Sequence, residues 1–361
     1  MTASPEPGAP VAAEPRAPVT TEAGVSVSAE PGAPAAARER SPAQGRLPDF
    51  FIVGHQKCGT TALYEMLRMH PQLFLPDVKE PRYFATDQRS RFAVTPGPGR
   101  PRTLEAYLAL FAAARAEQLV GEASPQYLRS AAAPHGIAQV CPHARIIAIL
   151  REPAAYLRSF HLQMVSSNVE TERDFRKALA LEDERRRGRR IPRRCQHPEA
   201  LLYSDHVRYT EQLRRYHEQF GRERVLVLIY EEFLRDNVGT VRQVLRFLGV
   251  DEHQPVEQVR TYRVRAVRHL WLHYLANAAR RARRNPAGAN RLGRVVNALA
   301  PDAAGSLAFR RWWRALVYGP APAPDERLAL ELRDRFEGEV RTLGQYLGRD
   351  LSSVWGYDAA G

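Results

Sequence analysis

Residues 50–61 read FFIVGHQKCGTT, and this stretch decides the fold. Its first part, residues 50–53, is an uninterrupted apolar run before a glycine, which is typical of a strand buried inside a parallel sheet. After Thr60 the apolar residues recur at helical spacing until Pro71, so a helix is expected to follow the loop. Residues 73–75 are apolar again. The pattern predicts a strand, a loop, a helix and a second strand within about 30 residues.

The same alternation continues outward from this unit. Apolar runs at residues 146–150 and 225–229 are typical of two more central strands, and a short strand is expected at Val120 and Gly121. Strands that alternate with helices predict an α/β fold on a central parallel sheet. The expected later helices span residues 204–220, 238–248 and 325–347.

Residues 1–46 differ sharply in composition from the rest of the 361-residue chain. They are rich in proline and alanine and hold no leucine, isoleucine or aromatic residue, so they cannot bury enough apolar surface to fold. We expect a disordered tail over residues 1–46 and one folded domain over residues 47–361. The three cysteines form no CxxC pair, and no basic start with an apolar run marks a secretory signal. These features predict a reducing, cytoplasmic location.

The loop after the first strand combines the features of a phosphate-binding cradle. Gly54 and Gly59 have the spacing of a Walker A loop, and Thr61 holds its hydroxyl position. The place of the Walker lysine is taken by Thr60, and Lys57 lies inside the loop instead. Glycines, a following helix N-terminus and a lysine predict an anion site. The shifted lysine argues against a standard magnesium–nucleotide site, and a P-loop kinase or ATPase remains the alternative enzyme.

Two further motifs are expected at the same edge of the sheet. Arg151 directly follows an apolar strand, and Ser159 lies about two turns into the next helix, so the pair can hold a second phosphate. The alternative is an arginine in a helix-end ion pair and a serine that faces solvent. Lys79 and Glu80 lie just past the second strand. Ligands in open α/β sheets bind at the carboxyl ends of the strands, so the three motifs predict one site.

Glu80 is the candidate general base of that site. A carboxylate is a poor ligand for an anion but a suitable base for an incoming hydroxyl. Pro81 is expected to hold Glu80 in an extended conformation. The alternative interpretation is an ion pair of Glu80 with Arg82 or Lys79.

Together these motifs resemble those of the PAPS-dependent sulfotransferases, where PAPS is 3′-phosphoadenosine 5′-phosphosulfate. The bacterial branch that looks like heparan-sulfate-type sulfotransferase domains is the most similar. The resemblance implies an α/β fold of three layers around a central parallel sheet, like that of the P-loop nucleotide hydrolases. The resemblance covers most of residues 49–251 and the extreme C-terminus. The matching stretches are FFIVGHQKCGTTALYEMLRMHP, KEPRYF, GEASPQYL, RIIAILREPAAYLRSFHL, VLVLIYEEFLRDNVGTVRQVLRFLGV and LGRDLSSVWG.

The resemblance implies transfer of a sulfuryl group from PAPS, without a metal, to a hydroxyl of a carbohydrate, a glycolipid or a secondary metabolite. Glu80 would be the general base, Lys57 would stabilise charge on the bridging oxygen, and His55 and Lys79 are candidate acceptor contacts. Some family members carry a lysine where this chain has Ala123. The PAPS-binding residues implied are Lys57, Cys58 (as a small neighbour rather than a nucleophile), Gly59, Thr60 and Thr61 for the 5′-phosphosulfate, Arg151 and Ser159 for the 3′-phosphate, and Arg263 and Arg265 in place of the family's late lysine- and glycine-rich loop.

Most of the net charge of +13 lies in residues 258–324, which hold 13 arginines and one acid, Asp302. Paired tryptophans at Trp312 and Trp313 accompany them. This Arg-rich region can steer anionic substrates, dock the protein on anionic lipid or be a solvated surface. No recognised nucleic-acid motif accompanies it, so nucleic acid is not the expected partner. A non-catalytic protein that binds membranes or nucleic acid is the alternative from a different functional class.

Overall fold

The computed structural model describes residues 46–88, 100–193, 195–257, 265–267, 316, 318–320 and 322–358. The chain divides into two units, Met1–Gln44 and Gly45–Gly361. The first unit, with almost all of the expected tail, lies outside the described residues. The fold below is that of the second unit.

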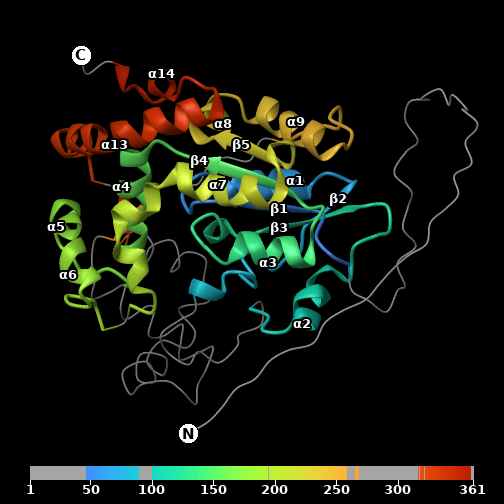
Figure 1. The fold of residues 1–361 in the computed structure, drawn as a ribbon, viewed down its shortest axis with the longest axis horizontal. Helices are drawn as coiled ribbons and strands as arrows, with labels where there is room; N and C mark the ends of the chain where they lie inside the picture. Colours follow the sequence, from blue (N-terminus) through green and yellow to red (C-terminus); the bar gives the residue numbers. More distant parts are fainter. Residues whose placement is uncertain are drawn as a thin grey trace, which may run out of the picture. The chain divides into compact units, whose positions relative to one another are not determined.

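Five parallel strands form the central sheet in the order β2-β3-β1-β4-β5 (Figure 1). The predicted strands are confirmed, with the second one residue shorter than expected. Residues 50–53 are fully buried, as their unbroken apolar run predicted. The strands are β1 (Phe50–Gly54), β2 (Leu73–Phe74), β3 (Leu119–Ala123), β4 (Arg145–Leu150) and β5 (Val225–Ile229).

Helices occupy most of the segments between and after these strands. The α-helices are α1 (Thr60–Arg68), α2 (Leu104–Leu108), α3 (Ala133–Val140), α4 (Pro153–Ser166), α5 (Phe175–Ala180), α6 (Glu182–Arg186), α7 (Tyr209–Phe220), α8 (Tyr230–Arg235), α9 (Asn237–Leu248), α13 (Glu326–Leu347) and α14 (Leu351–Trp355). Short 3₁₀ turns are η1 (Thr86–Gln88), η2 (Ala109–Phe111), η3 (Pro125–Tyr127), η4 (Pro198–Leu201), η5 (Tyr203–Val207) and η6 (Arg222–Arg224).

The order of the strands explains how the helices cover both faces of the sheet. From β1 through α1 to β2 the chain moves one way across the sheet, and from β3 through α3 to β4, and on to β5, it moves the other way. Right-handed crossovers therefore place α1 on one face and α3 and α7 on the other. The contacts agree, because α3 packs against α7 whereas α1 packs against α9 (Figure 1). This reversal puts a topological switch point at the neighbouring ends of β1 and β4.

One predicted helix is interrupted. Residues 204–220 were expected to be a single helix, but the structure has the 3₁₀ turn η5 and then α7, separated at Arg208, whose ψ of 59° is not helical. The turn brings His206 into the core, where it is buried. The predicted helices at 238–248 and 325–347 are confirmed as α9 and α13, each shifted by one residue at its start.

A second, two-stranded antiparallel sheet joins β6 (Arg265–Val267) and β7 (Tyr318–Pro320), and β6 contacts α4. Most of the Arg-rich region lies outside the described residues. Among the helices that are described, none is long and apolar enough to cross a membrane.

Candidate functional site

The loop between β1 and α1 has the backbone geometry of an anion cradle. Gly54 has a φ of 143°, and a Cβ there would lie 2.6 Å from the Ile149 carbonyl oxygen. Gly59, the N-cap of α1, has a φ of 84°. Lys57 also has a positive φ, of 71°. Because side-chain-bearing residues seldom adopt this region, the glycines allow the tight loop that leads into the free N–H groups of α1.

Lys57 and Arg151 meet at the switch point between β1 and β4. Arg151 Nη1 donates to the Lys57 carbonyl oxygen at 3.0 Å, and its guanidinium lies over the Tyr230 ring at 4.7 Å. Burial and the nearby charge of Arg151 lower the pKa of Lys57. Two cations held close together in a partly buried loop form a site whose electrostatics favour an anion.

The side chains predicted to hold the second phosphate retain unused hydrogen-bonding capacity. Arg151 Nε and Ser159 Oγ are both buried and have no hydrogen-bond partner among the described residues. Ser159 is only 4% exposed, so the alternative of a solvent-facing serine is wrong. Arg151 makes no ion pair with a described carboxylate, and its own carbonyl accepts from the Tyr209 hydroxyl at 2.9 Å. Buried orphan donors of this kind fit an anionic oxygen.

Lys79 connects the loop to the candidate base. Its Nζ donates to Thr61 Oγ1 at 2.8 Å and lies 3.7 Å from Glu80 Oε1. Arg82 also pairs with the Glu80 carboxylate. The expected ion pairs are therefore present, and the same contacts hold the Glu80 carboxylate at the edge of the sheet beside the loop.

The prediction that Pro81 holds Glu80 in an extended conformation is wrong. Glu80 has a φ of 60° and Arg82 a φ of 57°, both in the left-handed region. Tertiary hydrogen bonds override the local preference, because alternate N–H groups of this turn donate to the last residue of β3 and to the segment that follows it. Glu80 N donates to the Ala123 carbonyl at 3.0 Å, Arg82 N to Ser124 Oγ at 3.1 Å and Phe84 N to the Tyr127 hydroxyl at 3.2 Å.

Sequence reasoning missed Glu122, the buried carboxyl group beneath this turn. It is fully buried in β3 and accepts from the Tyr107 hydroxyl at 2.6 Å and the Tyr127 hydroxyl at 3.2 Å. Burial raises the pKa of Glu122 to about 7. A charged residue within a short buried strand was the available signal.

Two further residues of the loop, His55 and Cys58, are buried. His55 Nε2 lies 2.8 Å from Gln212 Oε1, the ring packs against Tyr156 and Tyr209, and burial lowers the pKa of His55 to about 3. Cys58 is buried, and burial raises the pKa of its thiol. His55 is therefore neutral at ordinary pH, and Cys58 is a packed thiol, in line with its predicted role as a small neighbour.

Arg263 lies outside the described residues, and so does the side chain of Arg265, whose backbone is in β6. Their predicted role in PAPS binding stays a prediction. Within the described part of the chain, no three histidine, cysteine or acidic side chains gather in a way that could hold a metal ion.

A cavity of about 410 Å³ opens beside the loop. Its lining includes His55 and Gln56 from the loop and Arg82 from the turn that carries Glu80. It therefore borders both the anion cradle and the candidate base.

Comparisons with known proteins agree on one family. A model described as the sulfotransferase family matches residues 48–255. A sulfotransferase of known structure from Alicyclobacillus acidocaldarius is 31% identical, with 74% of this chain covering 100% of that one at a TM-score of 0.53. Carbohydrate sulfotransferase 15 of Mus musculus is 29% identical over 251 residues, which are 56% of this chain and 44% of that protein. The bifunctional heparan sulfate N-deacetylase/N-sulfotransferase 4 of Mus musculus is 26% identical over 227 residues, 60% of this chain and 24% of that protein. The chain thus spans less than half the length of these curated relatives.

Proposed function

Because this chain belongs to the sulfotransferase family, we propose that it transfers the sulfuryl group of PAPS to a hydroxyl group of a glycan acceptor. One observation carries the proposal. Lys57 and Arg151, from separate motifs, meet at the carboxyl edge of the sheet, where Arg151 Nε and Ser159 Oγ are buried without a partner among the described residues. The Glu80 turn and a cavity border this edge.

We propose these roles for the residues of the site, and their positions support them. Lys57 and the N-terminus of α1, with Cys58, Gly59, Thr60 and Thr61, would hold the 5′-phosphosulfate. Arg151 and Ser159 would hold the 3′-phosphate, for which their orphan buried atoms are suited. Positive charge fixed at this edge stabilises the negative charge that grows on the departing phosphate, so electrostatics supply much of the catalysis.

Glu80 would accept the proton of the acceptor hydroxyl. The hydroxyl oxygen then forms a bond to the sulfur while the bond between the sulfur and the bridging oxygen of PAPS breaks. Arg82 and Lys79 hold the Glu80 carboxylate in place. Lys79 also contacts Thr61, which couples the position of the base to that of the donor loop. His55 lines the cavity beside the loop and stays a candidate acceptor contact.

The glycan class of the acceptor rests on the relatives, whose names specify carbohydrate and heparan sulfate. Glycolipids fall within the same class when their sugar carries the hydroxyl. We also propose a cytoplasmic protein that touches anionic lipid through the Arg-rich region, because residues 258–324 combine 13 arginines with paired tryptophans.

Transfer of ³⁵S from labelled PAPS into a panel of glycans, in the presence of EDTA, tests the proposal. We expect metal-independent labelling of at least one glycan and release of 3′-phosphoadenosine 5′-phosphate (PAP). Labelling that requires magnesium, with consumption of ATP and no use of PAPS, would instead establish the P-loop kinase or ATPase alternative.

A further inference from the structure

The cavity beside the loop has a lining that is unusual in two respects. Five glutamines and one asparagine line it, and none of its described lining residues is acidic although three are arginines. Amide side chains both donate and accept hydrogen bonds, as recognition of sugar hydroxyls requires. The lining therefore fits a polar ring with a negative charge. The inference below rests on the proposed function, since it concerns the acceptor of the same reaction.

Asn168 is a buried amide in the lining of this cavity. It follows the end of α4 with a φ of 58°, and it is only 3% exposed. Neither Nδ2 nor Oδ1 has a hydrogen-bond partner in the part of the chain that is described. A buried amide without partners is rare in folded proteins because it is unfavourable. Because Asn168 lies in the lining of the cavity, a bound ligand could supply the missing hydrogen-bond partners.

His206 also lines this cavity. Its Nδ1 pairs with the Tyr156 hydroxyl at 2.9 Å, while Nε2 is buried and makes no hydrogen bond of good geometry among the described residues, although the main-chain carbonyls of Glu199 and Ala200 lie near the ring. The ring is 2% exposed and packs against Phe160. The interruption of the predicted helix at η5 is what places this ring in the wall of the cavity.

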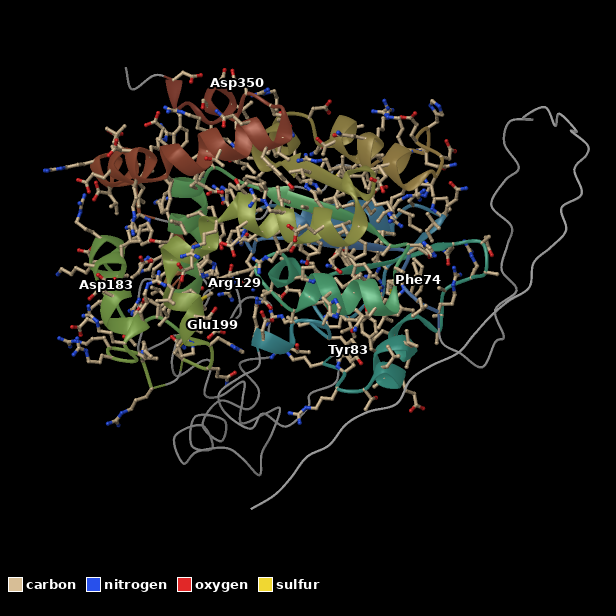
Figure 2. All side chains as sticks on the ribbon, in the orientation of Figure 1. Phe74, Tyr83, Arg129, Asp183, Glu199 and Asp350 are labelled. Carbon is tan, nitrogen blue, oxygen red and sulfur yellow. The ribbon has the colours of Figure 1, made fainter. Side chains whose placement is uncertain are left out.

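Among the described residues, the hydrogen-bond partners of the Arg129 guanidinium are neutral oxygens. Figure 2 shows it near Glu199, but Nη1 donates to the main-chain oxygen of Glu199 at 3.2 Å rather than to its carboxylate. Nη2 donates to Gln88 Oε1 at 3.4 Å. It makes no ion pair with any described carboxylate, although Glu199, Asp87 and Asp205 act on it from further away. A guanidinium held by neutral oxygens can still form charge-assisted bonds to an anion.

We propose that this cavity is the acceptor-recognition site, in which Asn168 and His206 bind sugar hydroxyls and Arg129 binds a carboxylate or sulfate group on the sugar. The acceptor is then an acidic glycan, and its negative charge is recognised at Arg129 in the cavity lining. Arg82 also lines the cavity, but its guanidinium already forms an ion pair with Glu80, the candidate base.

Direct binding tests the inference without relying on turnover. The probes are a glucuronate-containing tetrasaccharide, its carboxyl-reduced form, and the reduced form carrying one sulfate, each titrated calorimetrically into the full chain with PAP present. We expect the two charged probes to bind roughly 10- to 100-fold more tightly than the neutral one, because bonds to a charged group are the stronger kind. A preference for only one charged probe identifies which anion the site accepts.

The variants separate the two kinds of contact. Arg129→Gln should remove the preference for charged probes, Arg129→Lys should retain part of it, and Asn168→Ala should weaken all three probes by about 2- to 10-fold. Arg242→Gln removes a charge from an exposed position on α9 and should change nothing. The thermal shift caused by PAP monitors the donor site in each variant.

Equal binding of charged and neutral probes, unchanged by Arg129→Gln and Arg129→Lys, would overturn the inference. In that case, sulfate transfer to a neutral glycan would leave the proposed function standing. Conversely, Arg129-dependent binding of the charged probes without sulfate transfer to any of them would support the recognition site and contradict the proposed function.

Discussion

At the residue scale, Glu80 is the group whose replacement best separates chemistry from binding. Glu80→Gln keeps the shape of the side chain but removes the base, while the cradle around Lys57 and Arg151 is left intact. We expect kcat to fall by about 10²- to 10⁴-fold, with the Kd for PAP within about twofold of the wild-type value. Glu117→Gln, at an exposed carboxylate, is the matched control. Turnover close to that of the control would remove Glu80 from the mechanism.

Lys57 should affect both donor binding and turnover. Lys57 lies in the loop with a positive φ, and burial and the charge of Arg151 lower its pKa, so a bound anion would offset the local positive charge. We expect Lys57→Ala to raise the Kd for PAPS by about 10- to 100-fold and to lower kcat as well. The measurements are calorimetric titration and initial rates.

Lys177→Ala is the control for this lysine, because Lys177 is exposed on α5 and far from the loop in sequence. It should leave both quantities unchanged. If Lys57→Ala lowered kcat alone, the loop would not be the phosphosulfate site.

The sequence located residues at strand ends better than residues of the cavity. Lys57 and Arg151 follow strands whose apolar runs are unmistakable, and parallel strands bring their ends together whatever the details of packing. Arg129, Asn168 and His206 come from three separate segments, and nothing local in their sequence indicates that they share a wall. Their convergence depends on tertiary packing, which periodicity does not report.

At the scale of elements, β3 and the turn that carries Glu80 form one hydrogen-bonded unit, and Glu122 is its buried centre. Burial raises the pKa of Glu122 from 4.5 to about 7, so the folded protein retains a proton that the unfolded chain releases. The contribution of protonated Glu122 to the free energy of unfolding is fully present below about pH 4.5, and it is lost as the pH rises through about 7. The difference corresponds to at most about 3 kcal/mol.

Glu122→Gln should abolish this part of the pH dependence, because the amide stays neutral and can still accept from the tyrosine hydroxyls. We expect the free energy of unfolding of the wild type, relative to the variant, to fall by up to about 3 kcal/mol between pH 4.5 and 7.5. Urea unfolding at half-unit pH steps measures it, and taking the difference cancels contributions from His55 and other groups. Parallel curves for the two proteins would show that Glu122 is not protonated in the folded state.

Strands and helices matched their prediction where the local sequence had one clear secondary-structure preference. They differed from it where tertiary contacts opposed that preference. The unbroken apolar strands and the amphipathic α9 and α13 were predicted within about a residue. The backbone at Glu80 was not, because three tertiary hydrogen bonds outweigh the tendency that Pro81 imposes on its neighbour. The break before α7 likewise serves the burial of His206, which helical spacing alone did not predict.

At the scale of the whole molecule, the charge is concentrated in one stretch of sequence. Residues 258–324 carry a net charge of +12, so the remaining residues together carry only +1. The Debye length is about 10 Å at 0.1 M salt and about 3 Å at 1 M, so attraction of this stretch to an anionic surface should be strong in dilute salt and weak in concentrated salt. Each arginine near an anionic leaflet contributes about 1 kcal/mol.

We therefore expect the full chain to co-sediment with vesicles containing 30% phosphatidylserine in about 0.05 M NaCl, and to be released by about 0.5 M NaCl. Replacing Arg280, Arg281, Arg283 and Arg284 with glutamine should remove most of the binding, because it deletes a third of the local charge. Deleting residues 1–44 should have no effect, since that segment holds more acidic than basic residues. Binding that survives in high salt would indicate apolar insertion at Trp312 and Trp313. Absence of binding in low salt would contradict the membrane proposal, and the charge would then be expected to steer anionic substrates toward the cradle at Lys57.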